Sequence, residues 1–240
     1  MPSRRIMNPQ HRFLLDQFRN TKPGRGQTTQ RPEHLGTQRR WYGLKNEQRR
    51  RIMLDFIAAN RDLPYEDWLA LIDSLYQGVS YEERCAPQTL LVKFPRYRRQ
   101  LPLTQLEAWL GALEGWAEVD GSCQTVFTAQ DLLANWAGWR GLLESLAGDE
   151  NINKQRAALV LLTAPISQSA DERILNLSLA LIDRLKAEKD KRITKAISWL
   201  LRKGIKQHRD AISDFLDSRS DSLPAIAARE TRKKLATGKK

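Results

Sequence analysis

Apolar residues recur every three or four positions along most of the chain from about residue 46 onward. That spacing places them on one face of an α-helix, and no stretch shows the alternation of apolar and polar residues typical of a half-buried β-strand. The pattern therefore predicts an all-α protein, with prolines 64, 102, 165 and 224 at helix starts or joints. The expected helices cover residues 46–60, 64–77, 80–94, 103–114, 128–147 in two pieces, 149–163, 170–188, 190–206, 209–218 and 224–236.

These helices come in pairs with short connections between them. Each pair takes up roughly 40 residues, which lies within the range of HEAT-type repeats. Such pairs stack into a curved solenoid whose concave face suits a long partner. We therefore expect residues 41–240 to form one HEAT-like domain, a right-handed solenoid of stacked antiparallel helix pairs with a concave basic face and a basic C-terminal tail.

Residues 1–40 have a different character. This stretch is basic, is interrupted by prolines and has only Asp16 and Glu33 as acidic residues. The segment "FLLDQF" predicts a short helix, whereas "TKPGRGQTTQRP" cannot bury much surface and is typical of flexible chain. The stretch is therefore either an arm that contacts phosphates or a solvated tail.

The formal net charge of the 240-residue chain is +12. Such an excess favours a polyanionic partner, either nucleic acid or an anionic membrane surface. No stretch approaches the roughly 18 apolar residues that a membrane span requires, and the first twenty residues lack the apolar run of a secretory signal. Although an arginine-rich start is also compatible with an organellar transit peptide, we expect a cytoplasmic protein that does not bind membranes.

Metal and redox chemistry find little support in the sequence. Cys85 and Cys123 have no CxxC partner, which fits a reducing compartment better than a disulfide framework or a zinc site. His11, His34 and His208 share no ligand spacing, so no metal is expected. The chain also lacks the GxxxxGK[ST], HExxH and GxSxG motifs.

Most tryptophans follow the apolar spacing of their helices. Trp109, Trp136 and Trp139 continue stripes of leucines, which predicts packing roles for them. Trp199 differs, because it lies off the stripe of its helix, on a basic line. That line consists of Arg192, Lys195, Trp199, Arg202 and Lys206. A basic face with an aromatic ring in its middle is typical of nucleic-acid binders, although a solvated face with an incidental tryptophan remains the alternative.

The segment "GWAEVDGSC" places Trp116 four residues ahead of Asp120, so a helix would bring both to one face. Trp116 also continues the spacing of earlier leucines, which slightly favours a core position, unless Gly115 ends that helix and releases the ring into a joint. Asp120 taken alone is most often a cap or a surface acid. Arg156 lies among apolar residues and must snorkel to solvent, pair with an acid, or project into a cleft where a phosphate would satisfy it.

Five segments resemble motifs of one family, and the last two follow the WxxxD segment in the family's order. They are "WYGLKNEQRRRIMLDFI" (a GxxxPxxR helix start), "SYEERCAPQTLLVKF" (the following repeat), "WAEVD" (WxxxD), "DENINKQRAALVLL" (NIxxxRAA) and "KRITKAISWLLRKGIKQH" (KAIxWxLR). Over roughly residues 35–236 the chain resembles the DNA alkylation repair glycosylases built from HEAT-like repeats, the AlkD type.

The resemblance implies a function and a site. Asp120 would be the catalytic carboxylate, Trp116 and Trp199 the rings that cradle the lesion nucleotide, and Arg156 and Arg202 the groups that hold backbone phosphates. The family implies a monofunctional glycosylase that excises cationic N3- and N7-alkylated purines from double-stranded DNA without base flipping and without a cofactor. We expect Lys195, Arg192 and Lys206 to add DNA contacts, and we expect a monomer.

Two other functions compete with this interpretation. A non-catalytic HEAT-repeat protein would use the same basic face to bind DNA or RNA. A protein-interaction solenoid would leave the net charge and the Trp199 face without a role. Salt-sensitive binding to a duplex would disfavour the protein-interaction hypothesis, because counterion release marks phosphate contacts.

Overall fold

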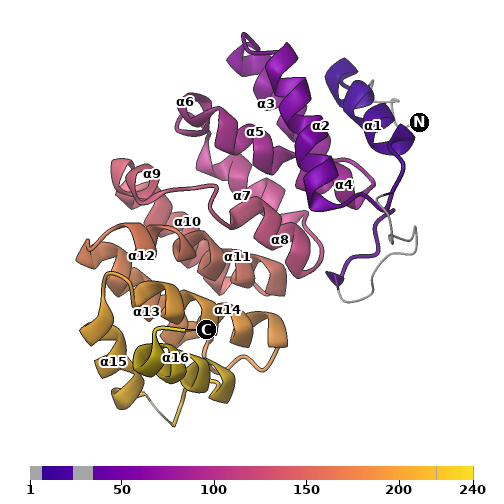
Figure 1. Cartoon of the computed structure of the whole chain (residues 1–240). Helices are drawn as coiled ribbons and strands as arrows, with labels where there is room; N and C mark the ends of the chain where they lie inside the picture. Colours follow the sequence, from indigo (N-terminus) through magenta and orange to yellow (C-terminus); the bar gives the residue numbers. More distant parts are fainter. Residues whose placement is uncertain (1–6, 24–34, 220, 240) are drawn as a thin grey trace. The chain divides into compact units, whose positions relative to one another are not determined.

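The computed structural model describes residues 7–23, 35–219 and 221–239 (Figure 1). Helices joined by short connections make up these residues, and no strand is formed among them. The one β-type feature is an isolated bridge between Arg40 and Ser80. The prediction of an all-α helical-repeat protein is confirmed. Within the described ranges, no helix is long and apolar enough to span a membrane.

The chain divides into two compact units. Unit 1 comprises residues 1–101 and 112–122, and unit 2 comprises residues 102–111 and 123–240. The helices of unit 1 are α1 (Pro9–Asn20), α2 (Asn46–Ala59), α3 (Tyr65–Tyr76), α4 (Tyr81–Cys85), α5 (Pro87–Lys93), α6 (Pro95–Arg98) and α8 (Gly115–Cys123, except its last residue). Those of unit 2 are α7 (Leu103–Gly111), α9 (Ala129–Ala134), α10 (Trp136–Gly148), α11 (Ile152–Thr163), α12 (Pro165–Gln168), α13 (Glu172–Leu185), α14 (Lys191–Gly204), α15 (Arg209–Ser218) and α16 (Ala225–Thr237).

In unit 1, α1 is fixed to the rest of the unit by both apolar and polar contacts. Leu14 and Phe18 are fully buried. The buried imidazole of His11 lies 2.7 Å from Ser74 Oγ on α3 through Nδ1 and 2.8 Å from Glu83 Oε1 on α4 through Nε2. Because all polar atoms of the imidazole have partners, its burial costs little. The histidine therefore connects three helices.

The segment expected as a basic arm is described only in part. The short helix predicted at "FLLDQF" is confirmed, and it extends over the whole of α1. Residues 35–40 are also described: residues 35–39 contact the start of α8, and Arg40 forms the bridge to Ser80. Residues 1–6 and 24–34, His34 among them, lie outside the described residues.

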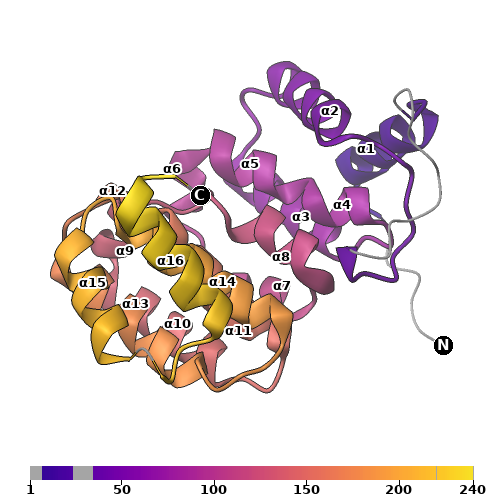
Figure 2. The same ribbon diagram turned by 60° about the horizontal axis from the view of Figure 1, so that its bottom comes forward.

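The core of unit 2 surrounds α11 and α14, which lie side by side in Figures 1 and 2, as do α14 and α16. At the start of α14, the side chain of Asp190 caps the helix by accepting a hydrogen bond from Arg192 N. The predicted apolar stripe of this helix is confirmed, since every member is fully buried: Ile193, Ala196, Ile197, Leu200 and Leu201. Burial of each large aliphatic side chain contributes about 1.5–3 kcal/mol. One face of α14 thereby belongs to the core, whereas Lys195 and Trp199 lie on its less buried side.

The predicted packing roles of two tryptophans in unit 2 are confirmed. Trp109 is 3% exposed and Trp139 is 4% exposed. Trp136, at the start of α10, is only half-buried, and the guanidinium of Arg173 lies 5.5 Å from its ring centroid. Trp136 therefore packs at the surface rather than in the core.

Helix boundaries differ from the predictions at several joints. The helix expected over 80–94 is divided at Ala86, because Pro87 starts a new helix at the position where a missing N–H does least harm. The helix expected over 103–114 ends at Gly111, and α8 begins at Gly115. The four-residue helices α6 and α12 were not predicted, since one turn is too short to show a period.

Candidate nucleic-acid interface

The solvent side of α14 faces a groove in unit 2. The groove has a volume of about 620 Å³. Its lining consists of Gln124, Arg156, Lys195, Trp199, Arg202, Lys203, Ile226, Glu230 and Lys234, contributed mainly by α11, α14 and α16. Four of the sequence-predicted site residues therefore meet here: Arg156, Lys195, Trp199 and Arg202.

Trp199 and Lys195 reach the groove from the face of α14 that the helical period predicted. They are four residues apart, and Trp199 is partly buried whereas Lys195 is exposed. The indole thus offers an accessible surface among ammonium and guanidinium groups. A ring flanked by cations is suited to a nucleotide, because sugar or base atoms pack on the ring while phosphates meet the cations.

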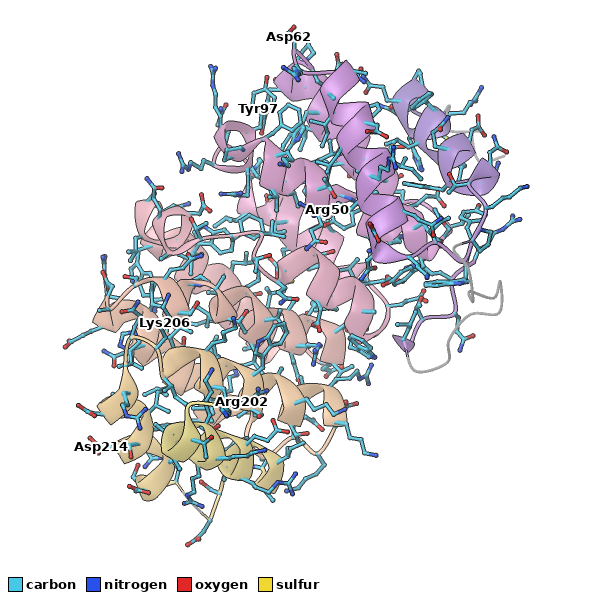
Figure 3. The ribbon with its side chains drawn as sticks, in the orientation of Figure 1. Arg50, Asp62, Tyr97, Arg202, Lys206 and Asp214 are labelled. Carbon is cyan, nitrogen blue, oxygen red and sulfur yellow. The ribbon has the colours of Figure 1, made fainter. Side chains whose placement is uncertain are left out.

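The guanidinium of Arg202 is held by two neighbours. Its Nε donates to the backbone oxygen of Ser198 at 3.1 Å and lies 3.2 Å from Ser198 Oγ, while its Nη2 lies 3.3 Å from Glu230 Oε2 on α16. Ser198 Oγ in turn donates to Glu230 Oε2 at 2.6 Å. The side chain of Arg202, labelled in Figure 3, is 12% exposed and therefore has a fixed orientation in the groove.

Arg156 also lines the groove, although only 5% of the residue is exposed. Its Nη1 donates to the backbone oxygen of Arg192, near the start of α14. The charge of Arg156 is among the causes that lower the pKa of Asp190, after the hydrogen bonds and charge of Arg192. Arg156 is thus a buried cation at the floor of the groove rather than a side chain that snorkels freely.

Two residues of the predicted basic line are not part of the groove lining. Arg192 forms a two-pronged ion pair with Asp190, with Nη2 at 2.6 Å from Oδ2 and Nε at 3.0 Å from Oδ1. Asp190 precedes Arg192 by two residues at the start of the helix, and its carboxylate engages the Arg192 guanidinium. Lys206 follows the end of α14 and is exposed; Figure 3 labels it apart from Arg202.

The other predicted site residues, Trp116 and Asp120, belong to α8 in unit 1. Both are partly buried and lie one helical turn apart. Trp116 packs against the cluster of Leu35, Tyr81, Cys85 and Ala117. It does not continue the stripe of α7, as the periodicity suggested, because that helix ends at Gly111. The indole is instead placed by its own short helix, with Asp120 on the same face.

The start of α8 requires glycine at position 115. The φ angle of Gly115 is +67°, and a Cβ atom there would lie 2.4 Å from the backbone oxygen of Leu35. The chain at residues 35–36 therefore crosses directly over the first turn of α8. This close approach fixes where the helix begins, and hence where Trp116 and Asp120 point.

A buried carboxylate on the opposite side secures the same helix. Glu118 Oε1 accepts from Thr37 Oγ1 at 2.8 Å, and Oε2 accepts from Glu114 N at 2.8 Å and from Arg39 Nε at 3.2 Å. Burial raises the pKa of Glu118, and these hydrogen bonds and the charge of Arg39 oppose that rise. Glu118 is therefore the structural acid of α8, whereas Asp120 lies on the partly exposed side.

A sequence profile of the DNA alkylation repair enzyme family matches residues 19–235. The chain belongs to this family. The resemblance drawn from the five motifs is thus confirmed, and the family gives the protein a role in DNA alkylation repair with DNA as the molecule it acts on.

A solved structure supports the fold. A chain described as a predicted DNA alkylation repair enzyme from Enterococcus faecalis matches with a TM-score of 0.67 and 20% sequence identity, over 88% of this chain and 100% of that chain. At this identity the likeness establishes the fold alone. A search of curated proteins returned no match.

In the described part of the chain, no cluster of three or more His, Cys, Asp or Glu side chains is placed to hold a metal ion. Cys85 and Cys123 are both buried as free thiols. Burial raises the pKa of Cys85 to about 11, which keeps its thiol protonated and unreactive near neutral pH.

Sequence reasoning did not identify the wall of the groove on α16. Ile226, Glu230 and Lys234 follow one another at intervals of four residues, which places them on one face of that helix. The spacing is visible in the sequence, but a Glu–Lys pair four residues apart is also the commonest sign of a solvated helix face. Only the packing of α16 on α14 distinguishes a groove wall from a solvated helix face.

Proposed function

We propose that the protein is a monofunctional DNA glycosylase that releases cationic N3- and N7-alkylated purines from double-stranded DNA and leaves an abasic site. Membership of the DNA alkylation repair enzyme family supports the class of substrate. The specific reaction is supported by the residues of α8 and of the groove in unit 2, which have the chemical character that this hydrolysis needs.

The reaction breaks the bond between C1′ of the deoxyribose and the purine nitrogen. The bonding electrons go to the base, whose positive charge they neutralise, so no general acid is needed for departure. Water adds to C1′, which acquires an oxocarbenium-like charge in the transition state, and a proton of that water is released. A carboxylate near C1′ stabilises this charge and helps to orient the water.

In this proposal Asp120 supplies the carboxylate. Trp116, one turn earlier on the same face of α8, and Trp199 on α14 pack against the deoxyribose of the damaged nucleotide. Their ring faces favour the positive charge that develops there. Arg156 and Arg202 hold the flanking phosphates, and Lys195 adds a further contact. The base stays outside any pocket, so discrimination depends on its charge and not on its shape.

The composition of the groove is the observation that best supports binding of DNA. It combines one accessible indole with five cationic side chains and a single carboxylate. Arg202 is oriented there before any ligand arrives. A groove of this composition matches a deoxyribose–phosphate backbone, in which apolar sugar edges alternate with anions.

The test is release of 7-methylguanine from a methylated duplex, measured under single-turnover conditions. We expect the rate of the Asp120→Asn variant to be at least about 100-fold lower than that of the wild type. Removal of one preorganised electrostatic group typically slows an enzymatic reaction by about 100- to 1,000-fold. Asp214→Asn is the matched control, because it removes the same charge from an exposed position on α15, outside the groove lining. Its rate should equal that of the wild type.

Other outcomes would change the assignment. Equal release by wild type and Asp120→Asn would preserve the glycosylase function but exclude Asp120 as its carboxylate. Salt-sensitive duplex binding without any base release would favour the non-catalytic DNA-binding function, which the same groove also supports.

A further inference from the structure

The C-terminal helix α16 presents two distinct faces. Ala227, Ala228 and Thr231 are buried against the rest of unit 2. Ile226, Glu230 and Lys234 lie on the adjacent face and line the groove together with residues of α14. Figure 2 shows α16 running beside α14. Arg232 and Lys233 are exposed on other sides of the helix and do not line the groove. Only one basic residue of this lysine-rich helix therefore points into the site.

The groove has a surplus of positive charge that its own residues do not neutralise. Glu230 is the single acid in the lining, and it is already engaged by Arg202 and Ser198. Within the described ranges of the chain, no acidic side chain lies within ion-pair distance of Lys203 or Lys234. Lys203 and Lys234 therefore line the groove together with Arg202, and neither shares its ion-pair partner Glu230.

Lys234 is partly buried and lies near two other cationic groups. Its pKa is lowered, first by partial burial and then by the charges of Arg202 and Lys203. Ammonium groups that repel one another in a partly dehydrated groove are stabilised when an anion binds between them. An anion bound among these groups would reduce the repulsion between Lys234 and the charges of Arg202 and Lys203.

We infer that Arg202, Lys203 and Lys234 form a phosphate subsite for the backbone of duplex DNA, so that α16 is part of the DNA-binding surface. The subsite deepens the proposed function, on which it rests, by adding Lys234 of α16, a residue that none of the five family-like segments contains. Arg202 offers planar donors that match phosphate oxygens, and the lysines add point charges from two different helices. Ile226 and Trp199 supply the apolar surface on which the neighbouring sugar packs.

The experiment measures binding of an undamaged duplex of about 20 base pairs as a function of salt. In Lys234→Gln we expect the affinity to fall about three- to tenfold near 0.1 M salt. The plot of log K against log salt concentration should become less steep by about 0.9, which is the contribution of one phosphate contact. Lys233→Gln is the matched control, since it removes the same charge from the next residue on an exposed side. Lys234→Arg should keep the wild-type slope.

The outcomes separate this inference from the proposed glycosylase activity, because binding to undamaged DNA involves no chemistry. Equal slopes for Lys234→Gln and Lys233→Gln would overturn the subsite, even if the wild type releases 7-methylguanine. A reduced slope in Lys234→Gln alone would establish the subsite, even if the wild type releases no base. Since Lys234 lies in the last turns of α16 and is not part of the core, thermal unfolding of the variants should match the wild type.

Discussion

Arg202 on α14 and Glu230 on α16 form an ion pair in which Nη2 and Oε2 are 3.3 Å apart. The pair lies in the groove, at the position where the proposed function places a backbone phosphate. Ser198 donates to the same carboxylate oxygen and is also in contact with Arg202 Nε. The carboxylate therefore orients the guanidinium in the empty groove and competes with a phosphate for it.

That competition gives the first prediction. The Glu230→Gln variant retains an oxygen that accepts from Ser198 and Arg202 but removes a negative charge from the groove. We expect it to bind an undamaged duplex up to about fivefold more tightly than the wild type, because one opposing charge at about 4 Å in water corresponds to roughly 1 kcal/mol. Fluorescence anisotropy with a labelled duplex provides the measurement. Weaker binding by Glu230→Gln would mean that the charge of Glu230 is needed to position Arg202.

The second prediction concerns the indole of Trp199. Its replacement by leucine keeps an apolar side chain but removes the ring face that the proposed mechanism uses. We expect single-turnover release of 7-methylguanine to slow by about tenfold, since a cation–π contact contributes about 0.5–2 kcal/mol. Trp136→Leu serves as the control, because Trp136 is also half-buried in unit 2 but does not line the groove. Equal losses in both variants would indicate general destabilisation.

The sequence predicted the α14 part of the groove because its helix is uninterrupted. Over the whole of α14 a single period separates the buried stripe from Lys195, Trp199 and Arg202, so that each position on the helix face follows from the spacing. Arg192 is on the same line, yet its guanidinium forms an ion pair with Asp190, two residues earlier. Periodicity locates a side chain on a face but does not tell which neighbour it pairs with.

The remaining parts of the site depend on contacts between residues far apart in the sequence. Glu230 meets Arg202 only because α16 packs on α14, and no local pattern contains that information. The start of α8 likewise depends on Gly115 lying under the chain at residues 35–36, about eighty positions earlier. The residues of the site are thus visible in the sequence, while their partners follow from tertiary packing.

The third prediction tests the close approach of the chain at residues 35–36 to Gly115. Gly115→Ala would place a Cβ in a left-handed backbone conformation and against the oxygen of Leu35. Left-handed geometry alone costs a non-glycine residue about 1–2 kcal/mol, so we expect the free energy of unfolding to fall by about 2 kcal/mol or more once the clash is included. Urea unfolding followed by circular dichroism measures the change.

A matched control for Gly115→Ala is Gly141→Ala on α10. No atom lies within 4 Å of the Cβ that this substitution adds, and the position is an exposed helix interior. Alanine there should stabilise the protein by about 0.5–1 kcal/mol, because it restricts the unfolded chain. A destabilised Gly141→Ala variant, or an unchanged Gly115→Ala variant, would contradict the assigned backbone conformations.

The fourth prediction concerns Glu83, the buried acid that joins α4 to His11. Burial by itself would raise the pKa of Glu83, but the hydrogen bonds from His11 and Ser80 outweigh it and lower the pKa below its ordinary value of 4.5. The folded state therefore favours the ionised carboxylate. Its contribution to stability is complete above about pH 4.5 and is lost as the pH falls from there through the pKa of the folded protein.

We expect this loss to appear in urea unfolding between about pH 7 and pH 3. Glu83→Gln cannot ionise, so the difference in unfolding free energy between wild type and variant should be constant above about pH 5 and shrink below it. Glu144→Gln is the control, because Glu144 forms an exposed ion pair with Arg140 that contributes little to stability. If the difference for Glu83→Gln stayed constant down to about pH 3, the carboxylate would not be held ionised by His11 and Ser80, and the polar attachment of α1 would need another explanation.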